Sequence, residues 1–251
     1  MPQKDTEPTE EVIHSLFDCK VVRIGEDRVV KSGPNLCSHE VLTLRFIAKH
    51  TTIPVPKVHD VRYEDERVTA ITMDYMPGKR LDEAWDSMDL DQKLFVSQQL
   101  NGYVSQMRSL KSNYIGALER GKAIIGQHGS LEGGPFDSEQ LFNEFILSDI
   151  VRTAPDLLRH NAKHALEDSH QIVFTHADLA PRNILVNEDG RVTALLDWGK
   201  AGWYPEYWEY VRALRQLKPM PDWPDYVSRI LPAAYEKEYI GMSFLAPLLR
   251  H

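Results

Sequence analysis

Two aspartates, a histidine and an asparagine stand close together in the stretch THADLAPRNILVNEDGRVTALLDWG, residues 175 to 199. They are His176, Asp178, Asn183 and Asp197. An aspartate can accept the proton of a hydroxyl group, while an asparagine and a second aspartate offer the hard oxygen ligands that magnesium prefers. Phosphoryl transfer from ATP requires this set of groups. A fold that brings the four side chains to one point would equip the stretch for that chemistry.

The spacing of these residues is more specific than their types. Protein kinases contain the pattern H-R-D-L-x-x-x-N followed by D-F-G, and this chain has HADLAPRN at 176 to 183 and DWG at 197 to 199. Aspartate and asparagine also favour turns, so any one of these residues alone is better explained as a loop former. The ordered set, by contrast, favours a kinase-like catalytic loop.

The sequence resembles the aminoglycoside phosphotransferase and choline kinase family, the small-molecule branch of the protein-kinase-like fold. That family typically has H-G-D-L-x-x-x-N in its catalytic loop and I-D-x-G-R or D-W-E at its metal strand, where this chain has HADLAPRN and LLDWGK. The resemblance covers residues 20 to about 217. It implies ATP and Mg²⁺ as cofactors, Asp178 as catalytic base or hydroxyl orienter, and Asn183 and Asp197 as magnesium ligands. It also implies that His176 supports the catalytic loop structurally.

Short strands must position this loop. QIVFTH at 171 to 176, NILVN at 183 to 187 and VTALLDW at 192 to 198 are strand-like runs, and a turn at 188 to 190 joins the last two. The loop follows the first strand, and Asp197 comes at the end of the last one. One hairpin can therefore aim the four polar side chains at a single point.

The first 77 residues predict a small antiparallel sheet with one helix. Residues 1 to 10 are expected to be a frayed tail, 20 to 25 and 28 to 33 a hairpin, 39 to 50 a helix, and strands follow near 58 to 63 and before Pro77-Gly78. After Gly78 the pattern is mainly helical. We therefore expect an α+β, bilobal protein-kinase-like fold, with residues 1–77 as a nucleotide-binding lobe and 78–251 as a helical lobe that carries the catalytic loop and the substrate site.

Two further patterns predict helices in the second lobe. Asp137 with Gln140 resembles a capping box that opens a helix through Ile150. Pro205 suits the first position of a helix that runs through YWEYVRALRQL. Residues 111 to 136 are Gly-rich and loop-like.

The first lobe contains candidates for nucleotide binding. A kinase-like lobe needs a strand lysine that holds the ATP phosphates and a helix glutamate that positions it, and Lys31 and Glu40 fit these roles. A solvated strand-end charge and an acid favoured by the helix dipole explain each residue equally well on its own. The backbone at Tyr75 and Met76, before Pro77-Gly78, is the candidate contact for adenine, although both side chains also suit an ordinary core.

The run GWYPEYWEY, residues 202 to 210, is the richest aromatic patch of the chain. Aromatic rings can stack on a substrate or attract its ammonium group, and they also form ordinary core. Most of these rings are expected to pack. Trp203 and Tyr204 are the candidate substrate contacts, and Glu206 and Glu209 either bind cationic groups of the substrate or cap and solvate a helix.

Several motifs depart from this pattern or compete with it. No G-x-G-x-x-G is present, and the first hairpin offers Gly25 alone as a backbone contact for phosphate. GALERGKA, residues 116 to 123, matches G-x-x-x-x-G-K but has Ala123 where magnesium needs a hydroxyl, so we interpret it as chance. His160, His164 and His170 suggest a metal site, but a solvated helix face explains them better because no third paired ligand is evident.

Composition limits the possible partners. The formal net charge of -8 and a pI near 5.7 argue against a nucleic-acid binder, which would carry a basic face. Cys19 and Cys37 are the only cysteines and form no metal-finger spacing, which suggests a reducing environment. A polar, acidic N-terminus and the lack of a long apolar run predict a cytoplasmic protein without a membrane partner.

The sequence leads to one favoured function and two alternatives. The favoured function is ATP- and Mg-dependent phosphorylation of a hydroxyl on a small molecule. A catalytically silent kinase-like binding or scaffold protein is the main alternative, because the Gly-rich loop is missing. Protein kinase activity is weaker, since no A-P-E-like element or activation loop follows DWG.

Overall fold

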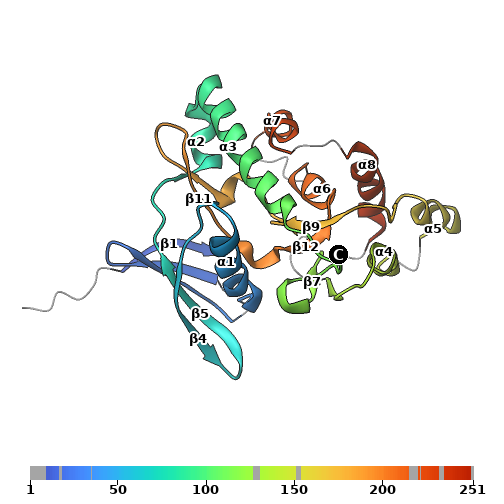
Figure 1. Cartoon of the computed structure of the whole chain (residues 1–251), viewed down its shortest axis with the longest axis horizontal. Helices are drawn as coiled ribbons and strands as arrows, with labels where there is room; N and C mark the ends of the chain where they lie inside the picture. The colour runs from blue at the N-terminus through green and yellow to red at the C-terminus, as the bar shows by residue number, and fades with distance from the viewer. Residues whose placement is uncertain are drawn as a thin grey trace, which may run out of the picture.

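A computed structural model describes residues 10–16, 19–34, 36–126, 131–150, 154–214, 220, 222–231 and 235–249. The chain forms a small antiparallel sheet with one helix, followed by a larger and mainly helical part (Figure 1). This arrangement confirms the α+β, bilobal protein-kinase-like fold expected from the sequence. No helix in the described ranges is long and apolar enough to span a membrane.

The N-terminal sheet contains five antiparallel strands in the order β1-β2-β3-β5-β4. The hairpin at Gly25 and the pairing of β3 with β5 confirm the expected organisation and place Lys31 opposite Ile71. The elements are β1 (Glu10–Leu16), β2 (Cys19–Ile24), β3 (Arg28–Ser32), α1 (Ser38–His50), β4 (Val58–Glu64) and β5 (Arg67–Asp74).

Strand β1 was not expected. The sequence predicts a frayed tail over residues 1 to 10 and assigns no helix or strand to residues 11 to 19. The residues of β1 whose burial the structure describes, 10 to 15, are all exposed, so the strand has no buried face that would give a hydrophobic pattern. Its pairing with β2, from Glu10 opposite Ile24 to Leu16 opposite Cys19, defines the strand instead. The remaining residues of the expected tail, 1 to 9, lie outside the described ranges.

The second part combines helices with three very small sheets. Its helices are α2 (Leu81–Ala84), α3 (Leu90–Ser109), α4 (Glu139–Ser148), α5 (Asp156–Lys163), α6 (Trp208–Leu214), α7 (Trp223–Ile230) and α8 (Glu236–Leu245), with 3-10 turns η1 (Trp85–Ser87), η2 (Leu118–Arg120), η3 (Pro181–Asn183), η4 (Trp198–Lys200) and η5 (Ala246–Leu248). Its strands are β6 (Lys79–Arg80), β7 (Ala123–Ile124), β8 (Glu132–Gly133), β9 (Ile172–Thr175), β10 (Ile184–Val186), β11 (Val192–Leu195) and β12 (Gly202–Pro205). They pair as β11-β10-β6, β12-β9 and β7-β8.

Two predicted helix starts are wrong. Ser138, not Asp137, caps α4, because the Ser138 side chain accepts the Leu141 N–H at 3.2 Å. Pro205 ends strand β12 opposite Ile172, and α6 begins only at Trp208. Proline lacks an N–H but is tolerated at an edge strand, so the sequence signal is compatible with both structures.

The hydrophobic core crosses the expected boundary at residues 77 and 78. One cluster of buried side chains joins Leu44 and Ile71 of the first part to Phe174 and Trp198 of the second. Helix α1 lies between the sheet and the helical part (Figure 1), and the Phe46 ring lies 5.2 Å from Phe174. Aromatic contacts of this kind add to the burial of apolar area. The division into 1–77 and 78–251 stays a prediction, since the two parts share a core.

Candidate active site

The loop after β9 has a rigid, buried backbone. His176 is completely buried, its Nδ1 lies 3.2 Å from the Asp178 N–H, and its Nε2 lies 3.1 Å from the Leu196 carbonyl. Nδ1 must accept the Asp178 N–H, so Nε2 carries the proton and donates to Leu196. Burial lowers the pKa of His176, which keeps the ring neutral in this tautomer. His176 therefore ties the loop to the residue before Asp197, as a structural support would.

Asp178 is the buried carboxylate of the loop. It is 3% exposed, and two cations contact its two oxygens: Arg182 Nη2 lies 2.7 Å from Oδ1 and Lys200 Nζ lies 3.3 Å from Oδ2. Burial alone would raise the pKa of Asp178, but Lys200 and Arg182 outweigh burial and hold this pKa below its ordinary value. The carboxylate is therefore ionised at neutral pH and can accept a hydroxyl hydrogen.

Asn183 directly precedes β10 and Asp197 follows β11, so both lie at the open end of the β10-β11 hairpin. The Asn183 carbonyl accepts the Leu196 N–H at 2.8 Å, and the Asn183 side-chain amide donates to the Asp178 carbonyl at 3.0 Å. Asp197 follows with φ of 63°, a left-handed conformation that turns the chain sharply after β11. The hairpin thus gathers all four polar residues, as the sequence spacing predicted.

Lys31 connects the sheet to this hairpin. Its ammonium lies 2.9 and 2.8 Å from the two Glu40 oxygens and 3.0 Å from Asp197 Oδ1. Burial would lower the pKa of Lys31, but the charges of Glu40 and Asp197 outweigh burial and raise it above its ordinary value. Glu40 is 3% exposed in the first turn of α1. The strand lysine, the helix glutamate and the aspartate of DWG therefore meet in one ion-pair cluster.

Oxygen ligands at this cluster suit a magnesium ion. The Asp197 side chain is 48% exposed although it contacts Lys31, so its carboxylate is accessible to a second cation. The Asn183 amide oxygen is the other hard donor at this hairpin. Asp197 and Asn183 would hold the ion, and Lys31 would lie beside the phosphates that the ion binds.

The segment after β5 contains Tyr75 and Met76, the backbone positions predicted to contact adenine. The Tyr75 N–H donates to the Asp27 carbonyl at 2.8 Å, and the Arg23 guanidinium lies 4.0 Å from the centre of the Tyr75 ring. The Tyr75 amide is thus engaged inside the sheet. Met76 is half-buried, with no sheet bond recorded at its backbone among the described residues. The adenine contact at Tyr75 and Met76 stays a prediction.

The aromatic candidates for substrate contact lie in the core. Trp203 is 8% exposed and its ring lies 5.0 Å from Phe174. Tyr204 is 1% exposed; its hydroxyl accepts the Ile124 N–H at 3.0 Å and lies 3.3 Å from the Ile124 and Lys200 carbonyl oxygens, to one of which it can donate. Their position on β12, paired with β9, explains the burial. Glu206 bonds Arg108 at 2.9 Å. These contacts favour packing and structural ion pairing for the three residues, and their contact with a substrate stays a prediction.

Two residues of α6 hold the backbone of the catalytic loop and were not identified from the sequence. Glu209 Oε2 accepts the His176 N–H at 2.7 Å and the Ala177 N–H at 3.3 Å, and Arg212 Nε donates to the Ala177 carbonyl at 3.0 Å. Ala177 has φ of 62°, which such bonds on both sides of the peptide stabilise. Burial raises the pKa of Glu209 to about 7. The sequence predicts for Glu209 only a substrate contact or a capping and solvated helix position, because it does not show which face of α6 meets the loop.

Arg182 and Lys200 were also missed, although both stand inside the motifs. Their charges are visible in HADLAPRN and DWGK, and the four-residue spacing of Asp178 and Arg182 was an available signal. The competing segment at 116 to 123 forms the short turn η2 and enters strand β7, so it lacks the helix that a P-loop requires. Its interpretation as chance agrees with this geometry.

Comparison with known proteins identifies the family. A family model described as the phosphotransferase enzyme family (APH) matches residues 19–248. No curated protein matches the sequence. Among solved structures, a GDP complex of an aminoglycoside 2'-phosphotransferase-IIIa mutant is 13% identical, with a TM-score of 0.63, 98% of this chain and 84% of that chain covered. The streptomycin-ATP-APH(2")-IIa ternary complex is 14% identical, with a TM-score of 0.61 and coverage of 96% and 83%.

A third structure extends the likeness beyond aminoglycoside enzymes. Macrolide 2'-phosphotransferase MphH from Brachybacterium faecium is 17% identical, with a TM-score of 0.58 and coverage of 98% of this chain and 85% of that chain. At such low identity these structures show the fold, while the family match spans nearly the whole chain. The resemblance expected from the catalytic loop is therefore confirmed, and the chain belongs to the phosphotransferase enzyme family.

Proposed function

We propose that this protein transfers the terminal phosphoryl group of ATP, with Mg²⁺, to a hydroxyl group of a small molecule. The observation that carries the proposal is the meeting of Lys31, Glu40 and Asp197 in one cluster, next to the loop that presents Asp178. Kinase-like phosphoryl transfer depends on this lysine-glutamate pair and on a metal-binding aspartate. The family match and the nucleotide complexes among similar structures support the proposal.

Each residue has a distinct task in the proposed reaction. Lys31, oriented by Glu40, binds the phosphates, and Asn183 and Asp197 hold magnesium, which offsets the negative charge of the phosphates. Asp178 orients the acceptor hydroxyl and takes its proton. Neutral His176 fixes the loop through Leu196.

Arg182 and Lys200 bring two positive charges to the catalytic loop, next to Asp178. Arg182 is 40% exposed while its guanidinium contacts the buried Asp178, so it can turn toward solvent and free Oδ1 for the hydroxyl. If the guanidinium stays within reach of the acceptor hydroxyl, it would stabilise the charge of the transferring group. Lys200 keeps the second Asp178 oxygen occupied.

The alternative is a kinase-like binding protein without turnover. One observation favours it: the β2-β3 turn consists of Gly25, Glu26 and Asp27 and has two acids where a phosphate-binding loop would need backbone amides. The intact cluster of Lys31, Glu40 and Asp197 favours the enzyme.

Calorimetric titration with Mg-ATP and Mg-GTP tests the metal site and the donor together. We expect saturable binding to the wild type and its loss in Asp197→Ala, with an unchanged far-UV spectrum and melting temperature near that of the wild type. Phosphate transfer is then measured against a panel of hydroxylated amines, sugars and macrolides. Nucleotide binding without transfer to any acceptor favours the binding protein, and undiminished binding in Asp197→Ala removes Asp197 from the metal site.

A further inference from the structure

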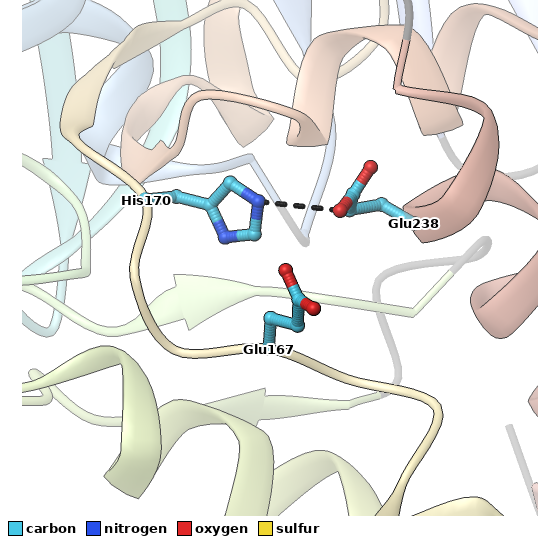
Figure 2. Close-up of side chains that lie close together, drawn as sticks. All are labelled: Glu167, His170 and Glu238. Atoms are coloured by element: carbon cyan, nitrogen blue, oxygen red, sulfur yellow. Dashed lines mark ion pairs between the residues drawn. The ribbon is translucent and has the colours of Figure 1, made fainter.

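A second group of potential metal ligands combines two residues that precede β9 with one residue of α8. Glu167 and His170 precede β9, and Glu238 lies on α8. Each side chain offers one ligand atom, and the three atoms lie within 4.8 Å of one another. Figure 2 shows the Glu167 and Glu238 carboxylates and the His170 ring pointing toward one another. Within the described residues this is the one such group of histidine, cysteine or acidic side chains.

His170 has the arrangement of a metal-binding imidazole. Its Nδ1 lies 2.9 Å from Glu139 Oε1, and Glu139 Oε2 accepts the His170 backbone N–H at 2.9 Å. The Glu139 side chain is 3% exposed, so this contact is firmly held. Metal-bound histidines almost always donate their second nitrogen to such a carboxylate, which fixes the ring and makes the ligand nitrogen more basic. Nε2 is the nitrogen that faces the other two carboxylates.

The spacing of the ligand atoms suits a small cation. His170 Nε2 lies 3.4 Å from Glu238 Oε1, longer than the usual nitrogen-oxygen hydrogen bond of about 2.9 Å. Two ligands at about 2.0 to 2.1 Å from a tetrahedral ion are separated by about 3.3 Å. The pair is therefore spaced as ligands of one ion, and Glu167 can close onto it because its side chain is 46% exposed.

An unpartnered buried hydroxyl is an independent sign of a ligand here. Tyr207 is 1% exposed, its ring lies 4.7 Å from that of His170, and its hydroxyl has no hydrogen-bond partner among the described residues. A buried hydroxyl without a partner is costly, and a water bound to a metal would satisfy it.

We propose that Glu167, His170 and Glu238 form a Zn²⁺ site, with Glu139 as the carboxylate that orients His170. One imidazole nitrogen and two carboxylate oxygens suit Zn²⁺, whereas Mg²⁺ and Ca²⁺ prefer oxygen ligands alone. The ion also offsets the negative charge of two carboxylates, Glu139 and Glu238, that are 3% and 12% exposed. Zinc would displace Lys237, whose ammonium pairs with Glu167.

The site would connect the C-terminal helix to the segment that enters the catalytic loop. Glu238 belongs to α8, while His170 stands two residues before β9, whose end leads into His176. Zinc would therefore stabilise the folded chain without contacting the nucleotide site. The expectation of a solvated helix face is wrong for His170, whose side chain is 10% exposed and lies outside α5.

Calorimetric titration of the chelator-treated full chain with ZnCl₂ in excess MgCl₂ tests the proposal. We expect one saturable Zn²⁺ per chain, a rise in melting temperature, and binding at least about 10-fold weaker in Glu167→Gln and in Glu238→Gln. Glu236→Gln is the matched control, because Glu236 is an exposed acid of the same helix. Lys237→Gln removes the competitor of the metal and is expected to tighten binding.

Glu167 is exposed, so Glu167→Gln is expected to leave the fold intact. Circular dichroism of each variant checks this. Substitution by Co²⁺ and its visible spectrum report a four-coordinate site with nitrogen and oxygen ligands. Absence of saturable Zn²⁺ binding overturns the proposal, as does binding that Glu167→Gln and Glu238→Gln both leave unchanged. The cluster would then be an ion-pair network around a protonated His170. The experiment measures Zn²⁺ binding only, so its result does not depend on whether the protein is a phosphotransferase.

Discussion

Asp178 is the residue on which the proposed chemistry depends most directly. Its two oxygens are paired with Arg182 and Lys200, which hold the pKa of Asp178 below its ordinary value. The carboxylate therefore keeps the negative charge that accepts the hydrogen of a hydroxyl group. A base that orients a hydroxyl acts in the transfer step and contributes little to binding of the nucleotide. The two effects can therefore be separated by one substitution.

We expect Asp178→Asn to lower kcat by ~100-fold to ~10,000-fold while nucleotide affinity changes little. The amide keeps the shape of the side chain and removes the negative acceptor. Asp189→Asn, in the exposed turn before β11, is the control and retains activity. The measurements are kcat, nucleotide Kd and melting temperature; full activity per folded molecule in Asp178→Asn would contradict the mechanism.

Arg182 is expected to set the acid limb of the activity profile. Its guanidinium helps to lower the pKa of Asp178, so Arg182→Gln raises that pKa. A carboxylate with a higher pKa becomes protonated at a higher pH. The acid limb of kcat/KM, which reports the free enzyme, therefore moves to higher pH in the variant. Arg191→Gln, which changes an exposed arginine of the same hairpin, leaves the limb in place, and an unmoved limb in Arg182→Gln would separate Arg182 from Asp178.

At the scale of elements, side chains of α6 hydrogen-bond to the backbone of the catalytic loop. Glu209 accepts the N–H groups of His176 and Ala177, and Arg212 donates to the Ala177 carbonyl that follows them. Glu209 is 4% exposed, and its Oε1 has no hydrogen-bond partner among the described residues. Protonation of Oε1 relieves the buried charge while Oε2 keeps both amides, which accounts for the raised pKa.

The pH dependence of stability tests this arrangement. Burial raises the pKa of Glu209 from 4.5 to about 7, so between these values the folded state binds the proton more strongly than the unfolded state. The contribution of Glu209 to unfolding free energy thus falls as pH rises from 4.5 to 7, by up to about 3 kcal/mol at about 1.4 kcal/mol per pKa unit. Glu209→Gln removes this dependence. Denaturant titrations of both proteins across the window measure it; parallel curves would show that Glu209 has an ordinary pKa.

The sequence identified this site better than it identified the elements around it. The sequence predicts Lys31, Glu40, Asp178, Asn183 and Asp197 because their types and spacing match kinase-like motifs, and the structure brings them together. The supports Glu209 and Arg212 were missed because backbone contacts impose no spacing on the residues that make them. Strand β1 was missed because its described side chains are exposed, and Pro205 was misassigned because proline suits both a helix start and the end of an edge strand.

At the scale of the whole molecule, the two parts are joined by one core. Buried side chains of α1 and β5 belong to the same cluster as those of β9 and η4, and Phe46 also lies 5.8 Å from Trp203. A shared core of this size disfavours independent motion of the two parts.

We therefore expect a single cooperative unfolding transition, with calorimetric and van't Hoff enthalpies equal. Phe46→Ala is expected to cost about 3 kcal/mol and to lower the melting temperature of that one transition. Phe95→Ala is the control, because Phe95 is 41% exposed on α3. Two resolved transitions in the wild-type thermogram would show that the parts unfold separately.

The ion pair between Lys31 and Asp197 joins residues 166 positions apart, and this separation has a consequence for biosynthesis. The N-terminal sheet leaves the ribosome long before Phe174, Trp198 and Trp203, against which α1 packs. Until those rings emerge, Phe46 of α1 lacks the Phe174 and Trp203 rings that it contacts in the native fold. The nascent chain must therefore pass through a long interval with an incomplete core, when it is open to chaperones and to aggregation.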